Sequence, residues 1–184
     1  CAPEYDAAKL KDSLIEIRKV TAEMGDDFFK RTQDLLASAG VGLVAATHIA
    51  GTKASGATRW INGRPIIQLS AYGKDADKMW FTLFHEIGHV LKHGKREQFI
   101  SFTSGVKSTD EQEADAFAAE TLIPSSAYAK FLTTGNFSEQ SIRKFANQQQ
   151  IHTGIVVGRL KNDRILPFSA MHHLHGKIAV RSDE

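Results

Sequence analysis

The chain has 184 residues, of which 42% are hydrophobic and 24% are charged, and its formal net charge is +2. This composition is ordinary for a globular domain, and so small a net charge argues against a surface for nucleic acid or anionic membranes. No apolar run approaches the roughly 20 residues that a membrane-spanning helix requires. The single cysteine, Cys1, excludes an internal disulfide, so we expect a cytoplasmic protein.

The first 40 residues predict two helices. In the first, apolar residues recur at helical spacing, namely Leu10, Leu14, Ile15, Ile17 and Val20. Asp26 or Asp27 is a suitable cap for the second helix, which we expect to run to about Ser38 and to end at Gly40.

A strand and a hairpin follow. Residues 41–46 predict a strand, and residues 51–56 form a loop rich in Gly, Ser and Thr. Residues 58–61 and 65–69 are strand-like and flank an Asn-Gly pair at 62–63, which is the strongest hairpin signal in the chain.

Residues 75–93 predict a helix that is buried on one side and contains the sequence His85-Glu86-Ile87-Gly88-His89. Histidines four residues apart on a helix lie one above the other, so both can reach one tetrahedral Zn²⁺. Glu86 is close enough to act on a metal-bound water, and H-E-x-x-H is the pattern found in zinc metalloproteases. Gly88 costs a helix about 1 kcal/mol against Ala, which indicates that another backbone or a substrate passes close to it.

The sequence predicts mainly helices in the second half of the chain. A polar, irregular stretch over 94–108 precedes a helix that Thr109 or Asp110 caps and Pro124 stops. Shorter helices are expected at residues 125–133, 138–150 and 154–160, before a His-rich tail. The whole pattern predicts an α+β domain in which a small sheet packs on the helix that carries the two histidines.

A catalytic zinc site requires a third protein ligand. The metzincin arrangement is excluded, because residues 95–103 contain neither the Gly nor the third His that it needs. His93 shares the face of His85 and His89, but about 12 Å of helix separates it from His85, which is too far for one metal. We therefore interpret His93 as a helix C-terminal cap.

The acidic residues of the following helix are better candidates. Glu111 and Asp115 are four residues apart and share a face, whereas Glu113 points about 160° away from them. If Glu111 binds the metal, Asp115 is placed to accept the other N–H of a ligating histidine. Glu111 is therefore the favoured third ligand, and Glu113 remains the alternative.

These motifs resemble the ImmA/IrrE family of metallopeptidases. The family signature is an H-E-[LI]-G-H helix, then E-x-x-A-[ND]-x-F-A, then an ending close to L-[LI]-x-P. This chain has H-E-I-G-H at 85–89, E-Q-E-A-D-A-F-A at 111–118 and L-I-P at 122–124, where many members have Leu-Leu-Met-Pro. Residues 65–93 and 155–160 further resemble the C-terminal domain of HigA-like antitoxin regulators.

The resemblance covers about residues 41–175 and implies a helical, zincin-like fold of the gluzincin type. We therefore expect N-terminal helices over 1–40 and a metallopeptidase domain over 41–184, which together form one compact unit. In thermolysin-type gluzincins an E-x-x-x-D pair supplies the third ligand and its supporting carboxylate, and Glu111 and Asp115 match that form. HigA-like proteins usually carry a helix-turn-helix domain before this region. No such segment is evident before residue 41, so contact with nucleic acid is expected only through a domain that this chain does not contain.

The expected chemistry is metal-assisted peptide hydrolysis. Zn²⁺ on His85, His89 and Glu111 acidifies its bound water, and Glu86 takes the proton and passes it to the leaving amine. Tyr72, His152 and Arg159 are candidates for a second oxyanion donor. The histidines of the tail, which are His172, His173 and His175, form either a second metal site or, as we favour, an exposed tail.

Two functions therefore remain in view. The first is a cytoplasmic zinc endopeptidase of narrow specificity, which the family resemblance suggests cleaves a regulatory protein such as a transcriptional repressor. The second is a metal-binding sensor or antitoxin-like module that binds a toxin or regulator without cleaving it. The chain has a suitable residue at all four expected catalytic positions, which favours the enzyme; these are His85, Glu86, His89 and Glu111.

Overall fold

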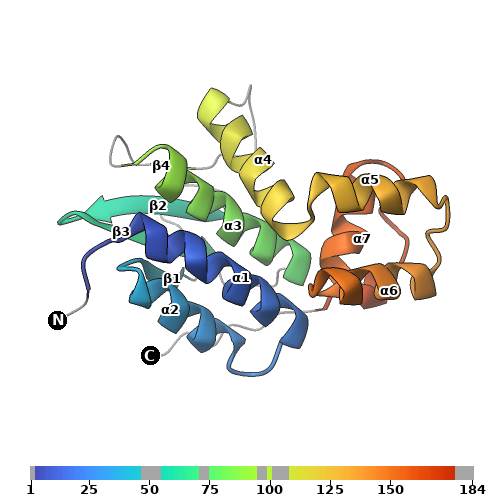
Figure 1. Ribbon diagram of the computed structural model, residues 1–184, viewed down its shortest axis with the longest axis horizontal. Coiled ribbons are helices and arrows are strands. Elements are labelled where there is room, and N and C mark those ends of the chain that lie inside the picture. The colour runs from blue at the N-terminus through green and yellow to red at the C-terminus, as the bar shows by residue number, and fades with distance from the viewer. Residues whose placement is uncertain (1–2, 47–54, 71–74, 95–98, 101–107, 177–184) are drawn as a thin grey trace.

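A computed structural model describes residues 3–46, 55–70, 75–94, 99–100 and 108–176. Helices outnumber strands, and together they confirm the predicted α+β class (Figure 1). The elements are α1 (Ala7–Glu23), α2 (Phe28–Ser38), β1 (Gly42–Ala46), β2 (Gly56–Ile61), β3 (Arg64–Ser70), α3 (Ala76–Lys92), β4 (Phe99–Ile100), α4 (Thr109–Leu122), α5 (Ser125–Thr133), α6 (Glu139–Gln149), α7 (Thr153–Asn162) and the 3₁₀ turn η1 (His172–Leu174).

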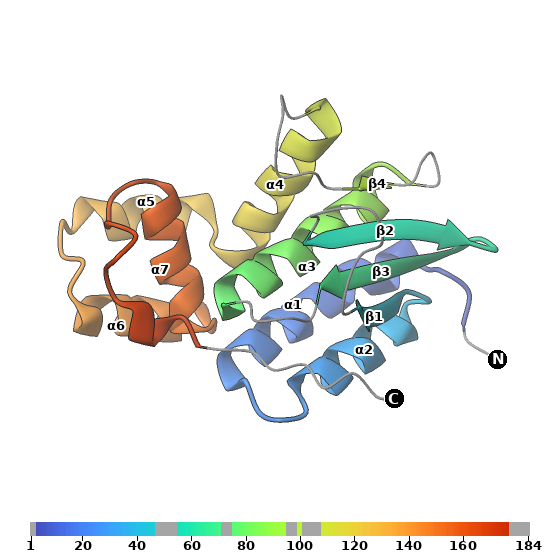
Figure 2. The same ribbon diagram turned by 180° about the vertical axis from the view of Figure 1, so that it is seen from behind.

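The four strands form a mixed sheet in the order β1-β3-β2-β4. β1 runs parallel to β3, whereas β2 is antiparallel to both β3 and β4. The predicted hairpin is confirmed: Asn62 and Gly63 have φ values of 50° and 80°, as a two-residue type I′ turn requires. Seen from behind, the sheet lies in front of α1, α2 and α3, so these helices cover one face of it (Figure 2).

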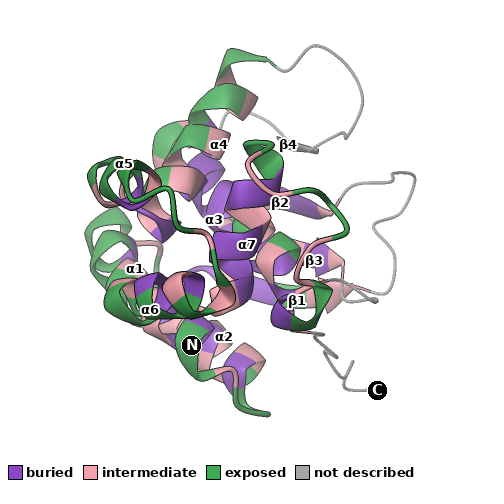
Figure 3. Cartoon of the chain, turned by 90° about the vertical axis from the view of Figure 1, so that its right-hand side faces the viewer, coloured by how far each residue is buried: buried purple, intermediate pink, exposed green. Residues whose placement is uncertain are grey.

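The α3 helix is the centre of the molecule and begins and ends within one residue of its predicted bounds. It packs on the strands β2 and β3 and on the helices α4 and α7. From Leu83 to Val90 every residue is buried, including the polar ones. Viewed from the side, buried segments gather in α3 and α7, while α5 and α6 present exposed faces (Figure 3). A helix buried on all sides can hold polar groups only where they bond one another, so its histidines must have partners.

The first two helices occupy their predicted positions, with one difference in capping. Asp27 precedes α2, but its side chain makes no capping hydrogen bond, whereas Asp6 caps α1 by accepting from the amides of Ala8 and Lys9. α1 reaches elements far along the chain, since Arg18 Nε donates to the carbonyl of Leu122 over 3.1 Å. None of the helices in the described ranges has both the length and the apolar composition needed to cross a bilayer.

Three predicted boundaries in the rest of the chain need correction. The cap of α4 is Ser108, whose hydroxyl accepts from the amide of Glu111, so Thr109 and Asp110 lie inside the first turn. Gly56, assigned to a loop, begins β2, and residues 51–54 of that loop lie outside the described residues. The stretch predicted as irregular, 94–108, contains the short strand β4.

Gly88 lies where α4 packs against α3. A Cβ built at Gly88 would lie 3.1 Å from Cδ1 of Phe117 and 3.2 Å from Cα of Ala114. The close approach predicted at this glycine is therefore that of the α4 backbone, and the two helices can touch because residue 88 has no side chain.

We expect the Gly88→Val variant to lose about 1–3 kcal/mol of unfolding free energy, because the added atoms overpack this contact. Urea denaturation of the wild type and of two variants tests this, with Ala129→Val on the exposed face of α5 as the matched control. Equal losses in the two variants would show that the helix contact at residue 88 tolerates a side chain.

Candidate metal centre

Two histidines of α3 bring their Nε2 atoms together at one point. His85 and His89 lie one turn apart, and their Nε2 atoms are 3.0 Å from each other. Both side chains are buried, with 6% and 0% of their surface exposed. The spacing of four residues on one helix face accounts for this convergence.

The third possible metal ligand comes from the first turn of α4. Oε1 of Glu111 lies 3.1 Å from Nε2 of His89, and Oε2 of Glu111 lies 3.4 Å from Nε2 of His85. Neighbouring ligands of a tetrahedral Zn²⁺ with bonds near 2.0–2.1 Å lie about 3.3 Å apart. The three distances are of this size, with the two from Glu111 measured at different oxygens. One ligand atom from each residue lies within 4.8 Å of the other two, so the three side chains are close enough together to hold one ion. The donor set of two imidazoles and one carboxylate also fits zinc.

The Nδ1 atom of each histidine is held by a further side chain. His85 Nδ1 lies 2.8 Å from Asp115 Oδ1, which is the relationship predicted for Asp115. His89 Nδ1 lies 3.0 Å from His93 Nδ1, and His93 Nε2 lies 3.3 Å from Glu113 Oε2. Hydrogen bonds at Nδ1 fix the orientation of each ring and leave Nε2 for a metal.

Glu113 and His93 therefore have roles that the sequence did not reveal. His93 does occupy the C-cap position of α3, as predicted, but its ring also connects His89 to Glu113. The Glu113 side chain is half-exposed and contacts His93, while the Glu111 carboxylate faces His85 and His89.

Glu86 is fully buried beside β2. Its Oε2 accepts a hydrogen bond of 2.7 Å from Thr58 Oγ1, and Thr58 is itself fully buried. A Cβ at Gly56 would lie 2.7 Å from Oε1 of Glu86, so the glycine leaves room for the carboxylate. Sequence reasoning missed both Thr58 and Gly56, because only the packing of β2 on α3 brings them to Glu86.

The electrostatics of the cluster favour a positive charge. Burial lowers the pKa of His85, but hydrogen bonds with Asp115 and Glu111 and the charge of Glu86 outweigh it and raise the pKa to about 9. Hydrogen bonds with His85 and His89 hold the pKa of Glu111 well below its usual range. The carboxylates around the imidazoles thus supply negative charge, which stabilises a cation at this place.

Two of the three candidates for a second oxyanion donor make their contacts with residues other than His85, His89 and Glu111. His152 caps α7 by accepting from the amide of Gly154, and burial lowers its pKa. Arg159 pairs with Asp163 over 2.8 Å and lies over the ring of Tyr128. Tyr72 lies outside the described residues.

The prediction of an exposed histidine tail is wrong for His175. This residue is buried, and its ring bridges Asp77 Oδ1 at 3.0 Å and Lys161 Nζ at 2.7 Å. His172 and His173 are exposed, as expected. The burial arises because η1 folds back against α3 and α7, with the carbonyl of Gly176 accepting from the amide of Ala76.

The contact between His93 and His89 predicts an effect on metal affinity. We expect the His93→Ala variant to bind Zn²⁺ about 10–100-fold more weakly, because the ring of His89 loses its support, and His93→Asn to recover part of the loss. Competition with a chromophoric chelator measures the affinity. The matched control is His173→Ala, which removes an exposed imidazole that pairs with Glu139. Wild-type affinity in His93→Ala would contradict the role.

The described residues thus form an α+β, zincin-like domain with a possible His-His-Glu metal site. A model of the Peptidase M78 family, described as the IrrE N-terminal-like domain, matches residues 40–161. The match covers more than half of the chain, so the chain belongs to the ImmA/IrrE family. This assignment supports a metallopeptidase-type fold, and a peptidase family implies protein substrates. A search of curated proteins gave no match.

Proposed function

We propose that this protein is a zinc-dependent endopeptidase of narrow specificity that cleaves a regulatory protein, such as a transcriptional repressor. The observation that carries the proposal is the close grouping of His85, His89 and Glu111, whose ligand atoms lie within 4.8 Å of one another. Glu86 follows His85 directly in the same helix. The family assignment supports the hydrolytic class.

In this proposal His85, His89 and Glu111 hold the zinc ion, which when bound acidifies a water molecule and polarises the substrate carbonyl. Asp115 and His93 keep the two imidazoles oriented through their Nδ1 atoms. These contacts leave the ligands in place before a metal arrives, which reduces the cost of ordering them.

Glu86 supplies the proton transfer. Its carboxylate takes a proton from the attacking water and delivers it to the amine of the departing peptide fragment. The hydrogen bond from Thr58 fixes the carboxylate through Oε2, and Oε1 lies toward Gly56. A base that is fixed in position needs little rearrangement during the reaction.

A metal-removal experiment tests the function. Purified protein is assayed for zinc content and for cleavage of casein and of candidate repressors, before and after treatment with a chelator. We expect stoichiometric zinc, cleavage that the chelator abolishes, and recovery when Zn²⁺ is added back. Bound zinc without cleavage of any protein would instead favour a metal-binding sensor or an antitoxin-like module.

A further inference from the structure

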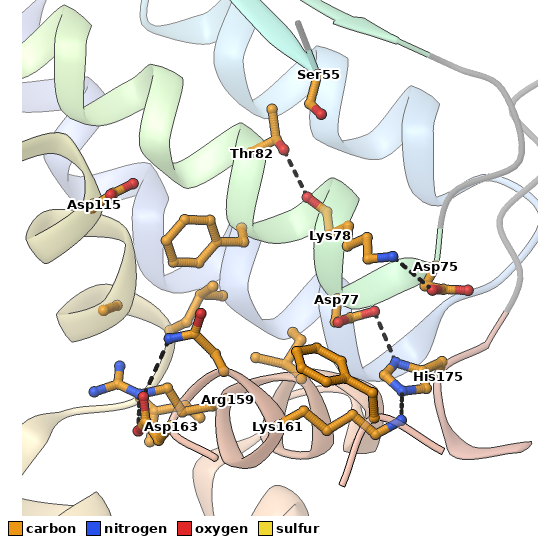
Figure 4. A pocket seen from close by; sticks show the side chains of 18 of the residues that line it. Ser55, Asp75, Asp77, Lys78, Thr82, Asp115, Arg159, Lys161, Asp163 and His175 are labelled. Carbon is orange, nitrogen blue, oxygen red and sulfur yellow. Dashed lines mark hydrogen bonds and ion pairs between the residues drawn. The ribbon is translucent and has the colours of Figure 1, made fainter. Parts of the chain in front are cut away.

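Three polar side chains from distant segments form a row of contacts that the proposed mechanism does not use. His175 Nδ1 lies 3.0 Å from Asp77 Oδ1, and His175 Nε2 lies 2.7 Å from Lys161 Nζ. Asp77 is in the first turn of α3, Lys161 is near the end of α7, and His175 follows η1. Figure 4 shows the three side chains joined by dashed lines, with the imidazole in the middle.

The lysine of this row is buried. Lys161 is 4% exposed and His175 is 6% exposed. Lysine is almost never fully buried unless its charge is paired. The group at hydrogen-bond distance from Lys161 Nζ is an imidazole, and the carboxylate of Asp77 lies on the other side of that imidazole. The arrangement therefore differs from a buried ion pair, because it places a proton acceptor directly against the amine.

The face of α7 that meets these groups lacks side chains at two positions. Gly154, Gly158 and Lys161 are four and three residues apart, so they share one face of the helix. A Cβ at Gly158 would collide with the Asp77 carboxylate, and a Cβ at Gly154 would lie 2.7 Å from the carbonyl oxygen of His175. Gly158 costs the helix interior about 1 kcal/mol against Ala. The close approach of Asp77 and His175 to α7 depends on these glycines.

The row lies in the wall of a cavity of about 700 Å³ between α3, α4, α7 and the segment around η1 (Figure 4). Its volume falls within the range of pockets that bind small molecules. Asp77, Lys161 and His175 line it, and Ile155 and Phe168 add apolar surface. A small molecule in this cavity would therefore lie next to the amine.

The two distances meet the requirement for an activated nucleophile. Such a site has a nucleophile and a base within about 2.6–3.2 Å and a third group that orients the base. The Asp77 carboxylate can only accept, so His175 Nδ1 carries the hydrogen and Nε2 has the free electron pair. An amine reacts as a nucleophile only after it loses its proton, and Nε2 is placed to take the proton of Lys161.

A metal ion is the other ligand that this place suggests, and its charge argues against it. Ligand atoms of Asp75, Asp77 and His175 lie within 4.8 Å of one another. However, Lys78 pairs with Asp75, and Lys161 contacts His175, so two ammonium groups already balance the two carboxylates. A divalent cation would have to displace these partners, whereas an uncharged ligand leaves them in place.

We propose that Lys161 is a carbonyl-binding amine, which forms an imine with a small uncharged aldehyde in the cavity. His175 Nε2 takes a proton from the ammonium group, and the free amine attacks the carbonyl carbon. The new N–C bond gives a carbinolamine, and His175 returns the proton to its hydroxyl group, which leaves as water. The product is the protonated imine, and the step needs no oxidant or reductant. This reaction goes beyond the proposed function and requires neither the metal nor peptide hydrolysis.

The test treats the zinc-loaded full chain with benzaldehyde and sodium cyanoborohydride, which reduces an imine to a stable benzylamine. Peptide mass spectrometry follows the benzylated fraction of each lysine over time. Lys130, which is exposed on α5, is the internal reference for an ordinary amine. We expect Lys161 to be labelled at least about tenfold faster than Lys130, because a base adjoins its amine. Benzyl alcohol, which fits the same space but cannot react, should slow the labelling of Lys161 alone.

Two variants separate proton transfer from packing. His175→Gln keeps a polar side chain without a basic nitrogen, and we expect labelling of Lys161 to fall about 10²-fold. Asp77→Asn removes the group that positions His175. It should lower the maximal labelling rate at least about tenfold and leave the benzaldehyde concentration at half-maximal rate unchanged. The matched control is Asp34→Asn on the exposed surface of α2, where Asp34 pairs with Lys30, and it should change neither quantity.

The wild-type result decides the proposal without any variant. Labelling of Lys161 no faster than that of Lys130 would overturn it. Fast labelling that survives in His175→Gln would also overturn it, because the reactivity would then not depend on the imidazole. A second zinc ion per chain that is lost in Asp75→Asn would identify the cluster as a metal site instead. None of these outcomes concerns the His-His-Glu centre, so the two proposals are tested separately.

Discussion

The Glu86→Gln variant is expected to retain zinc and to lose about 10²–10⁴-fold in kcat/KM for protein cleavage. The amide has the size of the carboxylate, and its oxygen can still accept from Thr58, so the fold and the ligand cluster are preserved. It has no basic oxygen that can take the proton of the attacking water. Fluorescent casein cleavage and metal analysis by mass spectrometry provide the two readouts.

A matched control for this experiment is Glu16→Gln, an equally conservative change on the exposed surface of α1, where Glu16 pairs with Lys19. It should leave both zinc content and cleavage at wild-type levels. Unchanged proteolysis in Glu86→Gln would remove the acid–base role assigned to this residue, even if the metal proved essential.

The second large effect concerns the third ligand. We expect the Glu111→Gln variant to bind Zn²⁺ at least about 100-fold more weakly, and Glu113→Gln to lose about tenfold at most. The reason is geometric: the Glu111 carboxylate lies within 3.4 Å of both Nε2 atoms, whereas Glu113 reaches the cluster only through His93. Competition titration with a chelator measures both variants.

The two glutamates lie in the same helical turn and carry the same charge, so the pair controls for loss of negative potential near the site. His89→Ala serves as the positive reference, because it should lose metal and hydrolysis together. A larger loss of affinity in Glu113→Gln than in Glu111→Gln would reverse the assignment of the third ligand.

Local patterns in the sequence predicted the elements that build the site. The bounds of α3 follow from its apolar spacing, and the turn at Asn62 and Gly63 follows from two residues that tolerate positive φ. The shared face of Glu111 and Asp115 follows from helix geometry alone, and the structure places the two carboxylates against His89 and His85 as that geometry implies.

The features that the sequence did not reveal depend on contacts between distant segments. Thr58 and Glu86 are 28 positions apart and meet only because β2 packs on α3. The burial of His175 depends on a contact with Asp77 across 98 positions. Periodicity carries no information about such pairs. The α4 cap was missed for a different reason: Ser108, Thr109 and Asp110 are consecutive and all suitable, so composition alone could not choose among them.

The proposed metal ligands come from two helices that are joined through residues 93–108 of the chain. An ion bound by both α3 and α4 would stabilise the folded state, because the unfolded chain has no assembled site for it. At a free metal concentration 1,000 times the Kd, such an ion would add about 4 kcal/mol to the unfolding free energy. The lifetime of the protein against degradation would then follow the zinc supply of its surroundings, independently of any substrate that it cleaves.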